Sequence, residues 1–199
     1  MTVIELPFTV QEIQEEGVVH AIIEVVRPSE RPGPFSPPQW AGSYGAVIWG
    51  SGLMIKIWGA GYAKSDDILR ASAVKRILEM VEQRVTLTIH CKGLEQQLRY
   101  VSASDGLTAD GKARFVGFSV LKKIQNARER GEWKLALYKK RQEPRGYRLA
   151  KHEAKKALAC ANSLNPFFSR FAEDCPDSKI IATNDNPNPD GLLNVYGGE

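Results

Sequence analysis

Residues 42–70 read GSYGAVIWGSGLMIKIWGAGYAKSDDILR, and this stretch decides the fold. Apolar runs from Tyr44 to Trp49 and from Leu53 to Trp58 flank a tight turn at residues 50–52, Gly-Ser-Gly, so we expect a β-hairpin. Residues 65–67, Ser-Asp-Asp, are types that favour the start of a helix. The stretch therefore predicts two paired strands followed directly by a helix.

The rest of the chain alternates between strand and helix patterns. A β-branched run from Val18 to Val26 predicts a buried strand, and alternating apolar and polar residues predict another from Arg84 to His90. The remaining elements are expected as a short helix at 91–100, a helix at 119–130, a strand at 133–138 and a helix at 149–163. This order predicts an α/β fold, in which helices pack on a mixed five-stranded sheet.

One domain with extensions fits the length of 199 residues. We expect an N-terminal extension at 1–17, the domain at 18–163, and a largely irregular C-terminal tail at 164–199. Within the domain, residues 27–41 form a proline-rich loop insertion, because their five prolines exclude a helix or a central strand.

Charge is unevenly distributed along the chain. The net charge is +4, yet residues 122–156 carry thirteen Lys or Arg against four Glu, a net of +9. Such a segment suggests contact with nucleic acid, although a solvated helix face also explains many basic runs. The chain has no apolar run long enough for a membrane helix and no signal peptide, and its three cysteines lack a C-x-x-C pair. We therefore expect a cytoplasmic protein without membrane contact.

Several short motifs occur in the order found in one enzyme family. They are GSYGAV at 42–47, AGY at 60–62 with KSDDILR at 64–70, VTLTIH at 85–90, TADGK at 108–112, the strand at 133–138 and HEAKKALA at 152–159. Together with the order of elements, these motifs resemble the bacterial ribonuclease H type I family. The resemblance implies a ribonuclease H-like fold over about residues 18–163.

The resemblance also implies where a catalytic centre would lie. Family members cut the RNA strand of an RNA–DNA hybrid with two divalent metals held by four carboxylates. The corresponding positions here are Glu24 or Val25, Arg70, His90 and His152, so at most one acid remains. Because Arg70 adds a fixed positive charge, this degenerate site favours a catalytically inactive chain, a pseudoenzyme without a metal cofactor, that binds nucleic acid or regulates.

An active ribonuclease H is the alternative. A displaced acid could still supply a ligand for Mg²⁺ or Mn²⁺, and the nearby candidates are Glu24, Asp66, Asp67 and Glu153. Asp66 and Asp67 can equally serve as helix-capping residues.

Basic and aromatic residues supply the candidate nucleic-acid contacts. Phosphates could be bound by Lys139, Lys140, Arg141, Arg145, Arg148 and Lys151, followed along the chain by Lys155 and Lys156. Tyr44, Trp49 and Trp58 could stack on bases, but at strand spacing such residues more often pack in the core.

Two further hypotheses concern the degenerate site. Glu24, His90 and His152 could form a two-histidine, one-carboxylate metal site, or a polar cluster around Arg70 that fills the vacated pocket. Cys91 could be a nucleophile, although a small buried residue at a strand end is the simpler interpretation.

A protein-interaction module without nucleic-acid contact is the third functional alternative. Phe167, Phe168 and Phe171 follow Pro166 and could fold back on the domain or bind a partner. The proline-rich loop could also be recognised by a protein partner.

Overall fold

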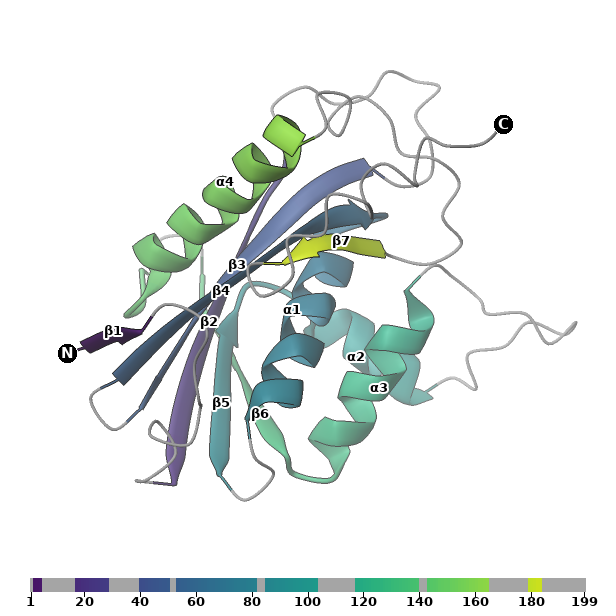
Figure 1. The fold of residues 1–199 in the computed structure, drawn as a ribbon. Coiled ribbons are helices and arrows are strands. Elements are labelled where there is room, and N and C mark those ends of the chain that lie inside the picture. Colours follow the sequence, from purple (N-terminus) through teal and green to yellow (C-terminus); the bar gives the residue numbers. More distant parts are fainter. Residues whose placement is uncertain are drawn as a thin grey trace, which may run out of the picture.

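The computed structural model describes residues 2–4, 17–28, 40–50, 53–81, 85–103, 117–139, 143–164 and 179–183. In these residues seven strands form one sheet, and four helices pack on it (Figure 1). The strands are β1 (Thr2–Ile4), β2 (Val18–Val26), β3 (Trp40–Gly50), β4 (Leu53–Ala63), β5 (Thr86–Cys91), β6 (Trp133–Leu137) and β7 (Lys179–Thr183). The helices are α1 (Asp66–Met80), α2 (Glu95–Ala103), α3 (Phe118–Glu129) and α4 (Tyr147–Leu164).

The sheet contains the five expected strands in the order β4-β3-β2-β5-β6. The pairs β3–β4 and β2–β3 are antiparallel, whereas β2–β5 and β5–β6 are parallel. The predicted hairpin and the predicted mixed sheet are therefore confirmed.

Two more strands extend the sheet beyond the five expected. β1 pairs with residues 53–55 of β4 in parallel, and β7 pairs with residues 59–62 of β4 in antiparallel orientation. Residues 179–183 lie in the tail that was expected to be largely irregular, and the sequence had not predicted this strand. Without β1 and β7, the outer edge of β4 would carry unpaired backbone N–H and C=O groups, and both short strands pair with these groups. A short apolar run in a polar segment does not indicate from sequence that such pairing will occur.

Helices cover the two faces of the sheet unequally. α1, α2 and α3 lie on one face and α4 lies on the other (Figure 1). Alternate side chains of β2 point to opposite faces, so Val19, Ala21 and Ile23 join the large core under α1 and α3. Ile22 instead packs with Ala150 of α4.

Local chemistry explains where the helices begin. The Ser65 hydroxyl accepts a hydrogen bond from the Ile68 N–H over 3.3 Å, which caps α1 as the sequence predicts. The short helix expected at 91–100 begins only at Glu95. The residues before it continue β5 and then turn through Gly93 and Leu94, both of which have positive φ angles.

α4 packs on the sheet at backbone distance. A Cβ atom built on Gly45 of β3 would lie 2.1 Å from the Ala150 carbonyl oxygen. The Ser43 hydroxyl donates to the Ala154 carbonyl over 2.6 Å. Glycine at 45 and the fully buried alanines 150, 154, 157 and 161 therefore allow this close approach. In the described ranges no helix, α4 included, is both long enough and apolar enough to cross a membrane.

Candidate nucleic-acid interface

The α4 side of the sheet presents three rows of side chains that cross its strands. Strand pairing defines the rows, because residues opposite one another on neighbouring strands point to the same face. The first row contains Gly45 and Glu24, the second Val47, Ile22, His90 and Ala136, and the third Trp49, His20, Thr88 and Lys134.

Glu24 is the centre of a polar cluster, which we define as Glu24, Lys92, Tyr138 and Tyr147. The Glu24 residue is 7% exposed, and its Oε1 atom accepts hydrogen bonds from the Lys92 ammonium at 2.9 Å and from the Tyr138 hydroxyl. The Lys92 nitrogen lies 4.5 Å from the centroid of the Tyr147 ring and 5.2 Å from that of Tyr138. Burial, followed by the hydrogen bond to Glu24, raises the pKa of Tyr138 well above its usual value, so its hydroxyl stays a donor.

A second group of charges lies at the start of α1. The Arg70 guanidinium is 2.7 Å from an Asp67 oxygen and 4.0 Å from Asp66. Arg27, after β2, binds Asp66 at 2.9 Å and donates to the carbonyls of residues 41 and 63. The Asp67 carboxylate also accepts the Leu94 N–H over 3.3 Å, which attaches α1 to the turn after β5.

Acids and bases compensate each other across both groups. Glu24, Asp66 and Asp67 carry three negative charges, and their ion-pair partners Arg27, Arg70 and Lys92 carry three positive charges. Asp66 and Asp67 were expected to cap the helix, and Ser65 supplies the side-chain cap while the two aspartates bind arginines.

Among the four positions of the degenerate site, Glu24 forms its ion pair with Lys92 rather than with Arg70, His90 or His152. Glu24 lies beside Lys92, because β2 and β5 run parallel with Ile22 opposite His90. His90 lies one row away and contacts His20, with 3.5 Å between its Nε2 atom and Nδ1 of His20. His152 is exposed on α4.

Sequence reasoning therefore missed Lys92, Tyr138, Tyr147 and His20. One available signal was the alternation of side chains along an extended chain. Residues 90 and 92 face the same side of the sheet, as do residues 20 and 24. Which of them lies opposite Glu24 depends on strand register, and the sequence alone does not state it.

These residues do not fit a pair of divalent cations. Magnesium prefers oxygen ligands such as carboxylates, and here an ammonium and a phenol hydroxyl both bind the Oε1 atom of Glu24. Across the ranges that the structure describes, no three His, Cys, Asp or Glu side chains are grouped so that they could hold a metal ion. The geometry favours the polar cluster over a site built from Glu24, His90 and His152, although Lys92 rather than Arg70 is its cation.

Cys91 and two of the aromatic candidates are buried in the core. Burial raises the pKa of the Cys91 thiol to about 12, so it is protonated at neutral pH and is a poor nucleophile. Tyr44 is 1% exposed and Trp58 is 6% exposed, both packed among apolar residues. Neither ring can stack on a base.

Trp49 differs from these rings, because it is half-buried and stacked on two histidines. We define the aromatic patch as Trp49, His20 and His90. The Trp49 ring centroid lies 5.6 Å from that of His20 and 6.0 Å from that of His90, with interplanar angles of 20° and 16°. Burial, and then the neighbouring His20, lower the pKa of His90, which keeps its ring neutral at pH 7.

The predicted phosphate-binding residues lie at the start of α4 and before it. Lys139, Arg145, Arg148 and Lys151 are exposed, whereas Lys140 and Arg141 lie outside the described residues. Arg148 forms an ion pair with Glu143 at 3.1 Å, and Lys151 lies 5.6 Å from the Tyr147 ring centroid. A hollow of about 310 Å³ opens here, lined by Glu143, Pro144, Gly146, Tyr147, Arg148 and Leu149.

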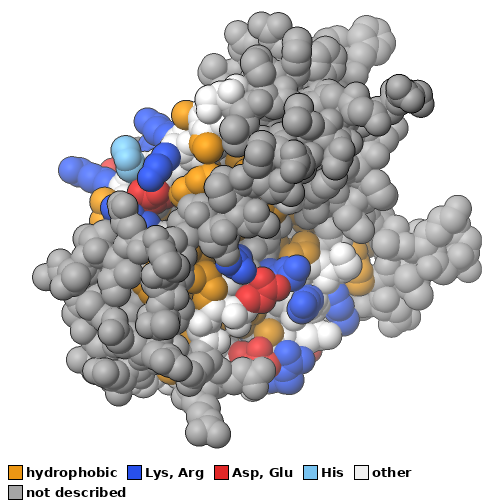
Figure 2. Space-filling view, viewed as in Figure 1, with side chains coloured by type: hydrophobic (Ala, Val, Ile, Leu, Met, Phe, Trp, Pro, Cys, Tyr) orange, Lys and Arg blue, Asp and Glu red, His pale blue; other side chains and the backbone are white. Residues whose placement is uncertain are grey.

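The exposed face of α4 carries only positive charge. Arg148, Lys151, Lys155 and Lys156 point outward. Glu153, the single acid in the helix sequence, is buried 3.9 Å from Lys56 of β4. Basic side chains gather accordingly over α4 in Figure 2. The phenylalanines at 167, 168 and 171 and residues 29–39 of the proline-rich loop lie outside the described residues.

Comparisons with known proteins identify the fold. No family model and no curated protein matches the chain. Among solved structures, LC9-RNase H1, a type 1 RNase H with the type 2 active-site motif, matches with a TM-score of 0.51 and 12% identity over 71% of this chain and 72% of that chain. The chain has a ribonuclease H-like fold.

Two further solved structures match with TM-scores below 0.5. The PFV RNase H domain matches with a TM-score of 0.44 and 14% identity, over 71% of this chain and 93% of that domain. The foamy viral protease-reverse transcriptase bound to an RNA/DNA hybrid matches with a TM-score of 0.45 and 12% identity, over 71% of this chain and 20% of that chain. At these identities the likeness is one of fold, and membership of the bacterial type I family stays a prediction.

Proposed function

We propose that this chain is a ribonuclease H-fold protein that binds nucleic acid without cleaving it. The observation that carries the proposal is the occupation of Glu24 by Lys92 and Tyr138. The carboxylate whose counterpart would bind metal in an active enzyme is here neutralised by a side chain of the same molecule. A fixed ammonium at this place repels divalent cations.

The alternative of a displaced catalytic acid is disfavoured by the same kind of contact. Each of the four candidate acids has a cation within reach: Glu24 binds Lys92 at 2.9 Å, Asp66 binds Arg27 at 2.9 Å, Asp67 binds Arg70 at 2.7 Å, and Glu153 lies 3.9 Å from Lys56. Recruiting any two of them for metal would require breaking two ion pairs.

The exposed face of α4 supports nucleic-acid binding. Its lysines and arginine can neutralise phosphates, and such contacts release counterions, so affinity falls as salt rises. Arg148 pairs with Glu143, but the acid of α4 is buried against Lys56, so the helix exposes no acid beside Lys151 and Lys155. We therefore assign the phosphate contacts to Lys151 and Lys155, together with the exposed basic residues before the helix.

The test follows fluorescence anisotropy of an end-labelled RNA–DNA hybrid mixed with the protein at low salt, with Mn²⁺ added after binding. We expect a rise that persists after the metal is added. A rise followed by a metal-triggered fall would show cleavage and contradict the proposal, and a flat trace would contradict nucleic-acid binding.

A charge variant identifies the surface. Replacing Lys151 and Lys155 with Ala should weaken binding and reduce the slope of log affinity against log salt by about one for each lost phosphate contact. Lys75→Ala is the matched control, because Lys75 is an exposed lysine on α1 across the sheet. An equal loss in both variants would indicate non-specific charge attraction and refute the assignment to α4.

A further inference from the structure

The aromatic patch extends from strands that α4 covers, β3 and β2, onto β5. α4 packs against β3, β2 and β4, whereas in the described ranges no helix packs substantially on the same face of β5 and β6 (Figure 1). The three rings are half-buried, so part of each reaches the surface. Aromatic side chains of this kind usually have a partner or a packing reason.

The three rings lie nearly parallel to one another. Their planes differ by 16° to 32°, and their centroids are separated by 5.6 to 6.0 Å. They come from three adjacent strands, β3, β2 and β5, whose pairing fixes their spacing. A sheet that presents rings on neighbouring strands is a surface on which successive unpaired bases can stack.

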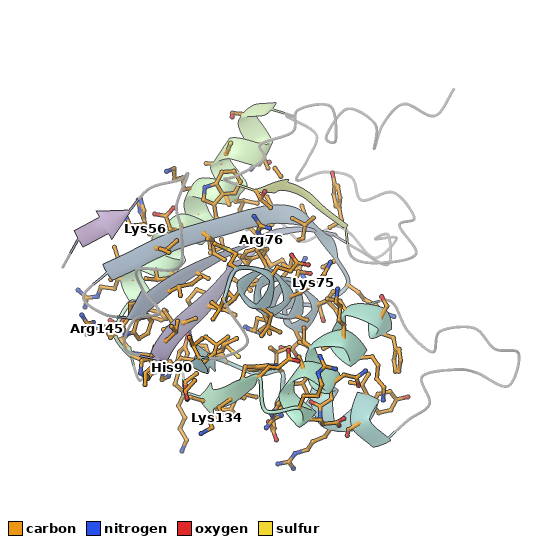
Figure 3. All side chains as sticks on the ribbon, turned by 60° about the horizontal axis from the view of Figure 1, so that its bottom comes forward. Lys56, Lys75, Arg76, His90, Lys134 and Arg145 are labelled. Carbon is orange, nitrogen blue, oxygen red and sulfur yellow. The ribbon has the colours of Figure 1, made fainter. Side chains whose placement is uncertain are left out.

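Positive charge flanks the rings, and their rows contain no acid. The row of Trp49 and His20 continues through Thr88 to Lys134, which is exposed on β6. Gly146 adjoins the Trp49 ring, since a Cβ built on it would lie 3.5 Å from that ring, and it is preceded by the exposed Arg145. Figure 3 labels His90, Lys134 and Arg145 in this region, away from Lys75 on α1.

We infer that the aromatic patch is a stacking site for the unpaired bases of single-stranded nucleic acid, with Lys134 and Arg145 beside its phosphates. The inference rests on the proposed function and adds a substrate class to it. Bases within a duplex are already stacked on one another and are not free to stack on these rings, so the patch selects single strands. The basic face of α4 has no such requirement, because phosphates are present in both forms.

The test compares two probes, a short labelled oligouridylate and an RNA–DNA hybrid of matched length. Trp49→Leu keeps an apolar side chain but removes the ring, so oligouridylate binding should weaken about tenfold while hybrid binding changes by less than about twofold. Trp49→Phe keeps a ring and should retain most of the oligouridylate affinity. Lys134→Ala should weaken oligouridylate binding, whereas Lys75→Ala should not.

Tryptophan fluorescence supplies a second readout. Bases that stack on Trp49 should quench emission of the wild type, and this quenching should disappear in Trp49→Phe even though that variant still binds. Trp58 and Trp133 are buried and should contribute little to the change. Loss of quenching with retained affinity would place the bases on the ring directly, which a purely structural role of Trp49 cannot produce.

Each remaining outcome discriminates between the two proposals. Binding of the hybrid but not of oligouridylate would overturn this inference and leave the proposed function standing, and binding of neither probe would overturn both. An equal loss of affinity for both probes in Trp49→Leu, together with a lowered melting temperature, would show that the ring only supports the fold. That result would also overturn the inference. A parallel arm with oligothymidylate shows whether the site takes RNA only or either single strand.

Discussion

The polar cluster and the aromatic patch lie on the same side of the sheet, yet they are built in opposite ways. In the cluster, Glu24, Lys92 and Tyr138 satisfy one another, and the carboxylate is almost completely buried. In the patch, Trp49 and His20 are half-buried, and the charge in their row belongs to the exposed Lys134. The polar cluster is neutralised by its own side chains, whereas the aromatic patch exposes part of its rings and a lysine to solvent.

The place where a fold usually carries its active site and the surface through which a given chain contacts its ligand can therefore be different. In the ribonuclease H-like fold the resemblance places catalysis at Glu24 and its neighbours, and here that place is internally neutralised. Function resides in particular residues rather than in the fold, so the partly exposed aromatic patch, one and two rows away, is the better candidate for ligand contact.

The largest effect should come from displacing α4 from the row that contains Glu24. Gly45→Ala places a methyl group against backbone atoms of α4, with the Ala150 oxygen at 2.1 Å, so we expect a loss of about 3 kcal/mol or more in the free energy of unfolding. Gly42→Ala, in the same strand, meets side-chain atoms of Leu69 and Arg27 instead, and should cost about 1 kcal/mol. Urea unfolding measures both, and equal losses would contradict the close packing of α4.

A smaller loss should follow from opening the polar cluster. Lys92→Ala leaves the Glu24 carboxylate buried without its cation, and we expect a loss of about 2 kcal/mol. The double variant Glu24→Gln with Lys92→Met should lose less, because no unpaired charge remains. Lys123→Ala, an exposed lysine on α3, is the control and should be nearly neutral. If the double variant is less stable than Lys92→Ala, the cluster is not held by mutual neutralisation.

The smallest effect should be a dependence of the free energy of unfolding on pH that is caused by His90 of the aromatic patch. Burial and His20 lower the pKa of His90 below its usual value of 6.5, so the unfolded chain binds more protons in the window below that value. The stability due to neutral His90 is complete above pH 6.5 and is lost as pH falls toward the lower folded pKa. When the pH is lowered from neutral to mildly acidic, the free energy of unfolding of His90→Gln should therefore fall less than that of the wild type.

Urea midpoints across that window measure the effect, with His152→Gln on the exposed face of α4 as control. The control should follow the wild-type curve. A His90→Gln curve that also follows the wild type would show that His90 is not held neutral by its surroundings.

Local sequence determined much of the fold. The two apolar runs around residues 50–52 were sufficient to predict the hairpin, and Ser65 to predict the start of α1, because turn and cap preferences act over a few residues. Strand alternation also indicated that Tyr44 and Trp58 pack in the core, as they do. These features depend on neighbours in the chain, so the sequence contains them directly.

Only the tertiary structure decided which residues meet. Register between the parallel strands β2 and β5 put Lys92 beside Glu24 and His90 beside His20, although a resemblance by motif had placed His90 at the carboxylate position. The outer edge of β4 likewise pairs with β1 and β7, and the local sequence of these segments gives little indication of a strand. Register and edge pairing join residues far apart in the chain, and the free energy that selects them comes from packing and hydrogen bonds that exist only after folding.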